Sequence, residues 1–191
     1  MRRAKLFMFF NMLMPLIAAW AIVWSGPVAA AEGQPSLGLP LICDPGRTCW
    51  LVNLVDHDPG PGMRDYACGE HGYNGHTGSD FAIRDYSKMD DGVPVVAAAA
   101  GKVLRLRDGM LDGDVSKVGK DAVAGKGCGN SVVIGHGDGW ETFYCHLRRG
   151  SLTVRPGQRV EKGDKLGFVG SSGLAEFPHV HLGVRKDRKI I

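Results

Sequence analysis

The clearest indication of the fold lies in residues 130–147, which read NSVVIGHGDGWETFYCHL. Two runs rich in β-branched and aromatic residues flank Gly137-Asp138-Gly139. A glycine-containing turn between two such runs is typical of a β-hairpin. The segment therefore predicts two antiparallel strands joined by a tight turn.

Short β-type runs separated by glycine-containing turns continue on both sides of this hairpin. Residues 93–107 (VPVVAAAAGKVLRLR) indicate two strands hinged near Gly101, and residues 151–173 add short strands between Pro-Gly and Lys-Gly-Asp turns. No amphipathic helix is expected after residue 31. The predicted fold class is mostly β, an antiparallel sandwich or open barrel of short strands.

One polar, glycine-rich segment, residues 108–127, interrupts this pattern (DGMLDGDVSKVGKDAVAGKG). Its position between two strand regions predicts a long surface loop, and loops of this length are usually functional or disordered. Two interpretations stay open: a rim that contacts a substrate or covers its groove, and an insertion without a role.

The N-terminus has the features of a targeting segment. Three basic side chains precede an almost entirely apolar run, residues 6–24, and Ala29-Ala30-Ala31 offers small residues for cleavage. This pattern predicts a secretory signal peptide over residues 1–31. The apolar run is also long enough for an uncleaved anchor helix. We therefore expect an exported protein of the periplasm or cell envelope, or one anchored in the inner membrane by its N-terminus.

Charge gives no indication of nucleic-acid binding. The formal net charge of +3 for the whole chain equals the three basic residues of the first 31 positions, which hold no acidic one. Residues 32–191 are therefore formally neutral, and no nucleic-acid partner is expected.

Five cysteines follow the targeting segment, and export permits disulfides. Cys43 and Cys49 close a short loop (CDPGRTC), and Cys128 and Cys145 lie at or near the ends of the predicted hairpin. We expect disulfides within these two pairs, which leaves Cys68 unpaired. A Cys49–Cys68 bridge is an open alternative. We expect residues 32–70 to form an N-terminal arm that contains the cysteine loop.

Two histidines stand two positions apart in HVHLGV, residues 179–184. Because residues i and i+2 of a strand point to the same side, His179, His181 and Gly183 share one face. The valines and leucine between them form an apolar face that belongs to a core. Neighbouring imidazoles suit metal binding or proton transfer. Two solvated histidines on an edge strand are the alternative.

A second motif, HTGSD, places His76 four residues before Asp80. The glycines around it argue against a helix and predict a loop that leads into a strand. An imidazole and a carboxylate from such a loop suit zinc, and one further imidazole completes three protein ligands with a position open for water. A local hydrogen bond between the two side chains is the alternative.

The third motif is YCHL at the end of the predicted hairpin, residues 144–147. Regular alternation predicts that Tyr144 and His146 share one face, opposite Phe143, Cys145 and Leu147. A single histidine at a strand end is often structural, so this motif alone indicates little.

Taken in order, HTGSD, YCHL and HVHLGV resemble the motifs of the lysostaphin/LytM-like zinc metallopeptidases. The connecting segments GVPVVAAAAGKV, CGNSVVIGHGDGWETFYCHL and VRPGQRVEKGDKLGFVGSSG resemble that family too, so the likeness covers about residues 75–185. It implies a duplicated hybrid motif fold and a metallopeptidase domain over residues 71–191. The chain ends six residues after Arg185, which is compatible with a domain truncated at its C-terminus.

The resemblance also implies roles for five residues. His76, Asp80 and His181 match the family's zinc ligands, and His146 and His179 match its catalytic pair, of which either is the general base. The implied function is that of a zinc metalloendopeptidase, which uses a zinc-activated water to hydrolyse peptide bonds in peptidoglycan stems or cross-links.

A non-hydrolytic module that binds the cell wall or activates an amidase is the alternative function. The partners implied are peptidoglycan peptides, with divisome proteins or amidases as further candidates, and a membrane only through an uncleaved N-terminus. Three positions depart from the family pattern, namely Cys145, Phe177 and Gly183.

Overall fold

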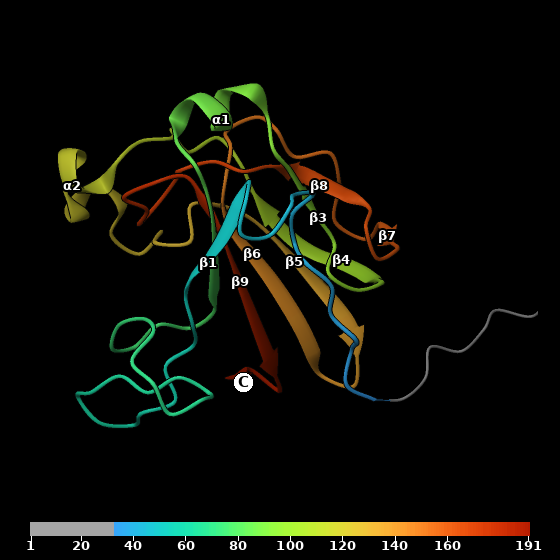
Figure 1. Ribbon diagram of the computed structural model, residues 1–191. Helices are drawn as coiled ribbons and strands as arrows, with labels where there is room; N and C mark the ends of the chain where they lie inside the picture. The colour runs from blue at the N-terminus through green and yellow to red at the C-terminus, as the bar shows by residue number, and fades with distance from the viewer. Residues whose placement is uncertain (1–32) are drawn as a thin grey trace, which may run out of the picture. The chain divides into compact units, whose positions relative to one another are not determined.

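The computed structural model describes residues 33–191, so the prediction of a signal peptide or anchor over residues 1–31 lies outside the described residues. The elements follow one another as shown in Figure 1: β1 (Cys49–Asn53), β2 (Ser79–Ile83), α1 (Tyr86–Asp91), β3 (Pro94–Val96), β4 (Gly101–Arg107), α2 (Val115–Val118), the 3₁₀ turn η1 (Lys120–Val123), β5 (Asn130–Gly137), β6 (Trp140–Leu147), β7 (Arg159–Val160), β8 (Lys165–Phe168), β9 (His179–Lys186) and β10 (Lys189–Ile190).

Antiparallel pairing dominates, as the sequence predicted. The large sheet has the order β1-β2-β9-β6-β5-β4-β7, β10 pairs with β9, and β3 pairs with β8 in a second, small sheet. The predicted hairpin is β5 and β6, with positive φ at Gly137, Asp138 and Gly139 in its turn. Strand β9, which comes late in the chain, lies between β2 and β6 (Figure 1) and so brings the three motif segments together.

The hydrophobic core lies between the two sheets. Val95 of β3 and Leu166 of β8 are fully buried, as are Ile134 and Val180 of the large sheet. The buried hydroxyl of Tyr144 accepts a hydrogen bond from the Ala98 amide at 2.8 Å, so its polar end is satisfied. The large sheet thus has one face in the core, and the other face is available for a site.

No long amphipathic helix was expected after residue 31, and the described residues contain only two short α-helices. Helix α1 begins after Asp85, whose carboxylate accepts from the Lys88 amide, and ends at Gly92 with φ of 86°. Helix α2 has only four residues. Neither helix is long enough for a 3.6-residue hydrophobic period to stand out in the sequence. None of the helices within residues 33–191 has the length and apolar composition of a membrane span.

Residues 108–127 form the predicted connection between β4 and β5, but they are partly helical and tied down. The Asp112 carboxylate accepts hydrogen bonds from the amides of Ser171 and Arg149, at 2.9 Å each. Val115 of α2 is buried, and its amide donates to the carbonyl of Ala175 at 2.9 Å. The segment therefore has a fixed place beside residues 171–175.

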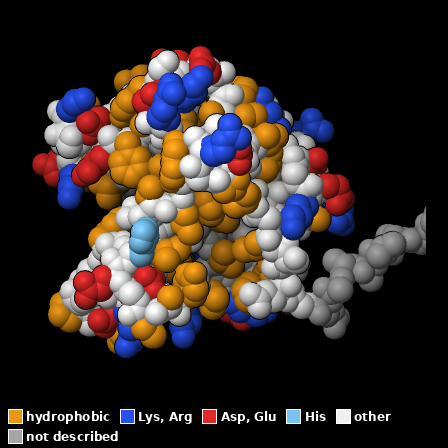
Figure 2. All heavy atoms as spheres, in the orientation of Figure 1, with side chains coloured by type: hydrophobic (Ala, Val, Ile, Leu, Met, Phe, Trp, Pro, Cys, Tyr) orange, Lys and Arg blue, Asp and Glu red, His pale blue; other side chains and the backbone are white. Residues whose placement is uncertain are grey.

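Both disulfides expected from the spacing are present, Cys43–Cys49 and Cys128–Cys145, and Cys68 is free and exposed. The first disulfide lies at the start of β1, which pairs with β2 and so extends the large sheet. Figure 2 shows hydrophobic side chains over the middle of one face, with basic and acidic side chains interspersed around them.

Candidate metal centre

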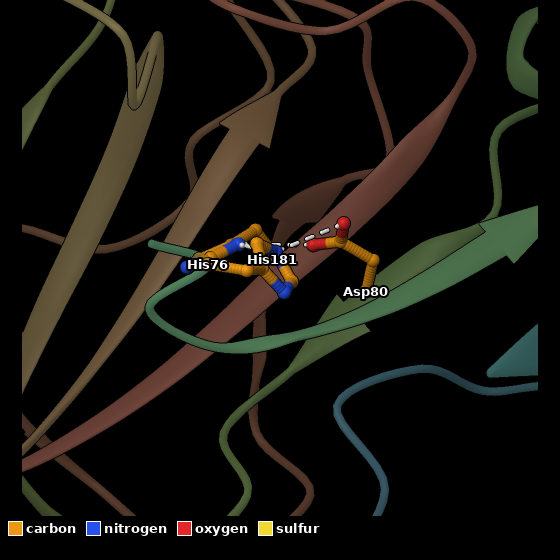
Figure 3. A group of neighbouring side chains, drawn as sticks. All are labelled: His76, Asp80 and His181. Carbon is orange, nitrogen blue, oxygen red and sulfur yellow. Dashed lines mark hydrogen bonds and ion pairs between the residues drawn. The ribbon is translucent and has the colours of Figure 1, made fainter. Parts of the chain in front are cut away.

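Three buried side chains from two strands and a loop meet on the large sheet. Asp80 of β2 pairs in register with His181 of β9, and His76 lies on the loop that leads into β2. Their candidate ligand atoms all lie within 4.8 Å of one another. Figure 3 shows the two imidazoles and the carboxylate directed at one point. The structure thus brings together the three residues that the sequence singled out as metal ligands.

Close contacts define this cluster. His181 Nδ1 lies 2.9 Å from Asp80 Oδ1, and His76 Nε2 lies 3.1 Å both from Asp80 Oδ2 and from His181 Nδ1. A Cβ at Gly78 would come within 2.5 Å of His181 Nε2. A glycine at that position therefore lets the loop pass close to the imidazole.

Neighbouring groups orient the cluster. His76 Nδ1 lies 2.7 Å from the Leu54 carbonyl oxygen. Since a carbonyl only accepts, Nδ1 carries the hydrogen, and Nε2 presents its lone pair to the cluster. The Asn53 amide donates to Asp80 Oδ2 at 2.9 Å. Sequence reasoning missed Asn53, because only the pairing of β1 with β2 brings it near Asp80.

A second pair of imidazoles, His146 and His179, lies beside the cluster. Both are buried, and their ring centres are 4.6 Å apart. His146 Nδ1 donates to the Ser172 carbonyl at 2.7 Å, and His179 Nδ1 donates to the Phe177 carbonyl at 2.8 Å. In both neutral rings Nε2 is therefore unprotonated and able to accept a proton.

The prediction that Tyr144 and His146 share a face is wrong. Tyr144 and Leu147 are buried in the core, whereas His146 lies beside the cluster. His146 has φ of 63°, in the left-handed region, and its amide donates to the carbonyl of Cys128 at 2.9 Å. This irregularity breaks the two-residue alternation at the end of β6 and directs His146 to the same side as Cys145.

Burial and charge set the protonation of these groups. Burial lowers the pKa of His146 to about 3, with a smaller lowering from the nearby His179. Burial also lowers the pKa of His179, although the Asp80 carboxylate opposes this. Burial raises the pKa of the Asp80 carboxyl, but the imidazoles of His181 and His76 that contact it outweigh this effect and hold that pKa well below its usual range. The resulting site contains an ionised carboxylate beside two neutral imidazoles.

Two imidazole nitrogens and one carboxylate oxygen form a donor set that fits zinc. Catalytic zinc sites typically have three such protein ligands and keep a fourth position for water or substrate. A hydrogen bond from Asn53 to the carboxylate and one from His76 to a backbone carbonyl are the kind of outer contacts that hold metal ligands in place.

The cluster lies between two hollows of the surface. One has a volume of 590 Å³ and is lined by His76, His181 and His146 among others; the other has a volume of 430 Å³ and is lined by Asp80 and His179. Tyr73 and Leu174 line both. The Tyr73 ring lies 4.6 Å from that of His76, a contact that sequence reasoning missed. An extended chain that passes from one hollow to the other crosses the cluster.

Comparison with known protein families identifies the family to which the chain belongs. Residues 74–191 match the sequence model of Peptidase family M23. This chain belongs to peptidase family M23. The M23 match includes all five residues of the two clusters described above, and the predicted lysostaphin/LytM-like relationship is confirmed.

Curated relatives support the M23 assignment but are much longer proteins. The cell division protein DipM of Caulobacter vibrioides is 32% identical over 107 residues, which are 56% of this chain and 16% of that protein. The peptidoglycan DD-endopeptidase ShyA of Vibrio cholerae is 32% identical over 106 residues, 56% of this chain and 19% of ShyA. The chain thus matches less than a fifth of the length of either relative.

A solved structure shows the same fold. The catalytic domain of a mutant of the prophage-encoded M23 protein EnpA from Enterococcus faecalis is 23% identical, with a TM-score of 0.50 over 82% of this chain and 92% of that domain. The mostly antiparallel architecture predicted from the sequence is therefore confirmed as that of an M23 peptidase.

Proposed function

We propose that this M23 protein is an exported zinc metalloendopeptidase that hydrolyses peptide bonds in the stems or cross-links of peptidoglycan. The observation that carries this proposal is the convergence of His76, Asp80 and His181 beside the neutral pair His146 and His179. The relative ShyA, which is named as a peptidoglycan DD-endopeptidase, supports the substrate class. Two disulfides in the described residues suit an oxidising compartment outside the cytoplasm.

His76 Nε2, Asp80 and His181 Nδ1 are the groups that would hold the metal. Bound zinc would supply Lewis acidity, which polarises a carbonyl and lowers the pKa of a water to about 7. The ionised Asp80 contributes the negative charge that favours a cation at this point. Asn53 and the Leu54 carbonyl keep two of the ligands oriented.

The other two imidazoles would move the proton. Each presents an unprotonated Nε2, so either can take the proton of the attacking water and pass it on to the leaving amine. The ring that has accepted the proton carries an N–H and a positive charge, and can then stabilise the oxyanion of the tetrahedral intermediate. Their burial removes competing water from this exchange.

Digestion of purified sacculi tests the proposal, with mass analysis of the products and zinc measured in each protein. We expect Asp80→Ala and His181→Ala to lose zinc and cleavage together. We expect His146→Ala to retain zinc while turnover falls on the order of 10²–10⁴-fold. The exposed His57 provides the control variant His57→Ala, which should cleave as the wild type does.

Retained zinc in Asp80→Ala, or undiminished turnover in His146→Ala, would contradict these assignments. Wild-type protein that binds zinc but releases no products would favour the alternative function, a module that binds the wall or activates an amidase. The relative DipM is named as a cell division protein, which makes divisome proteins and amidases the partners to test in that case.

A further inference from the structure

The larger hollow continues from the metal cluster across the sheet to three arginines. Its lining includes Arg105 and Arg107 of β4, three strands away from β9, and Arg185, which lies on β9 four residues after His181. Among its lining residues in the described part of the chain there is no aspartate or glutamate. The groove therefore concentrates basic charge, whereas residues 32–191 as a whole have a formal net charge of zero.

Strand pairing places Arg107 in line with the cluster. Asp80 pairs with His181, His181 pairs with Cys145, and Arg107 pairs with Ser131, which lies opposite the irregular end of β6. Neighbouring strands lie about 4.8 Å apart, so the three steps from β9 to β4 amount to about 14 Å. An extended peptide advances about 3.3 Å per residue. A peptide whose scissile bond lies at the cluster therefore reaches the arginines within about four residues.

The basic charge is only partly compensated. One carboxylate, Glu141, accepts from both Arg185 and Arg105, the latter at 3.4 Å. The guanidinium of Arg107 donates to two backbone carbonyls, those of Gly129 at 2.6 Å and Lys126 at 3.3 Å. These contacts hold the Arg107 side chain in place without neutralising it. Three positive charges thus face one negative charge at this end of the groove.

The smaller hollow differs in charge. It is lined by Glu176 and Lys120 as well as by Asp80, so acidic and basic groups are mixed there. The difference in charge between the two hollows therefore favours one orientation of a bound peptide. Its anionic part is favoured over β4, away from Asp80 and Glu176.

We propose that Arg105, Arg107 and Arg185 form a subsite for a carboxylate of the wall peptide. A planar guanidinium matches a carboxylate with two parallel hydrogen bonds, which gives geometric selectivity as well as attraction. The inference rests on the proposed function, because it assigns the substrate group that fits one end of the same groove.

Binding to the His146→Ala protein, loaded with zinc, tests the subsite while turnover is strongly slowed. The probe is the labelled pentapeptide L-Ala-D-Glu-L-Lys-D-Ala-D-Ala, used as the free acid and with its carboxylates converted to carboxamides. Fluorescence anisotropy should show about tenfold tighter binding of the free acid, because hydrogen bonds to charged groups are the stronger ones. Adding Arg107→Gln or Arg105→Gln should remove most of this preference and leave the carboxamide unaffected.

Arg159→Gln is the matched control, since Arg159 of β7 is exposed and lines neither hollow. The Arg105 variant guards against a folding defect, because the Arg105 side chain is largely exposed and its one hydrogen bond within residues 33–191 is to Glu141 at 3.4 Å. In the turnover-competent protein, the same arginine substitutions should raise KM and leave kcat nearly unchanged.

Equal binding of the two peptides, or an equal loss for both in Arg107→Gln, would overturn the subsite. Competition by inorganic phosphate combined with equal peptide binding would assign the arginines to phosphate groups and would overturn it as well. Failure of the subsite is distinguishable from failure of the proposed function. If the protein cleaves the free acid and the carboxamide peptide equally well, the subsite alone is refuted. If the arginines give the expected binding preference but no peptide is cleaved, the endopeptidase activity alone is refuted.

Discussion

Backbone carbonyls decide which nitrogen of each histidine faces the site. His76, His146 and His179 all donate Nδ1–H to a carbonyl oxygen, those of Leu54, Ser172 and Phe177. Each ring therefore presents Nε2 to the site, His76 toward the candidate metal cluster and His146 and His179 beside it. None of these three contacts needs a particular partner side chain, so the amino-acid sequence gives no sign of them.

Asn53 is the partner of Asp80 whose removal is most informative. Asn53→Ala deletes the amide that donates to Asp80 Oδ2 at 2.9 Å and leaves the three candidate ligands intact. Because hydrogen bonds to ligating carboxylates hold them in position, we expect zinc affinity to fall about 10–100-fold. Competition with a chromophoric chelator measures this. Asn74→Ala is the control, since the exposed Asn74 amide donates only to the Pro61 carbonyl, and equal zinc affinity in both variants would count against a positioning role for Asn53.

His146 should make the zinc-free protein sensitive to acid. Burial lowers its folded-state pKa to about 3, whereas the unfolded chain titrates near 6.5. Between these values the unfolded state binds more protons, so the free energy of unfolding falls as the pH decreases from 6.5. Relative to its value at neutral pH, we expect the loss at pH 5 to be about 2 kcal/mol larger for the wild type than for His146→Ala.

Urea denaturation at pH 7 and pH 5, with chelator present, measures this difference. His57→Ala controls for the loss of an imidazole at an exposed position. Parallel pH dependence in the wild type and in His146→Ala would show that His146 is not held neutral by burial.

Strand β9 illustrates what the sequence predicts well. Its alternation of histidine and glycine with valine and leucine correctly predicted one face in the core and one at the site, because β9 is regular over that stretch. The end of β6 was predicted wrongly, since the left-handed φ of His146 interrupts the alternation. There the His146 amide donates to the carbonyl of Cys128, which lies in the turn just before β5, and the sequence gives no sign of this contact.

Some residues of the site were likewise predicted from the sequence and others were not. Its five histidine and aspartate residues stand in ordered motifs and were all singled out from the sequence, and the structure brings them together. Asn53, Tyr73 and the arginines of β4 carry no motif. Asn53 and the arginines reach the site through the pairing of β1 with β2 and of β4 with β5, and Tyr73 reaches it from the loop before β2, none of which the sequence determines.

The disulfide Cys128–Cys145 should act on catalysis through His146. Cys145 precedes His146 in β6, and the Cys128 carbonyl accepts the His146 amide at 2.9 Å. In Cys128→Ser/Cys145→Ser we expect zinc content to be unchanged and kcat to fall on the order of 10–100-fold, because small displacements of a reacting group are costly. Digestion of sacculi, with zinc measured in parallel, tests this.

The second disulfide offers a matched control. Cys43→Ser/Cys49→Ser removes a bridge between residues 6 apart rather than 17, outside the two hollows. From loop closure we expect losses in the free energy of unfolding of about 2 and about 3 kcal/mol respectively. Stability should therefore fall in both variants, whereas kcat should fall only in Cys128→Ser/Cys145→Ser. A similar kcat for the two double variants would refute positioning by Cys128–Cys145.

The order of strands in the large sheet places the core and the candidate site on opposite faces of β9. Because β9 lies between β2 and β6, its apolar face closes the core against the small sheet, while its other face carries His181 of the candidate metal cluster and His179 of the second imidazole pair. The core side chains do not depend on a bound ion. We therefore expect the zinc-free protein to fold, and metal binding to add stability to a chain that is already folded.

That added stability is measurable as a shift in Tm. A ligand that binds only the folded state at 100 times its Kd contributes about 2.7 kcal/mol. For a domain of this size, each kcal/mol corresponds to about 2–4 °C, so zinc should raise Tm by about 5–10 °C. Magnesium should not, because it prefers oxygen ligands in octahedral geometry to two imidazoles and a carboxylate. Asp80→Ala should fold with a Tm that zinc leaves unchanged. The same zinc-dependent shift in Asp80→Ala and in the wild type would place the bound ion elsewhere, and the cluster of His76, Asp80 and His181 would no longer account for the chemistry.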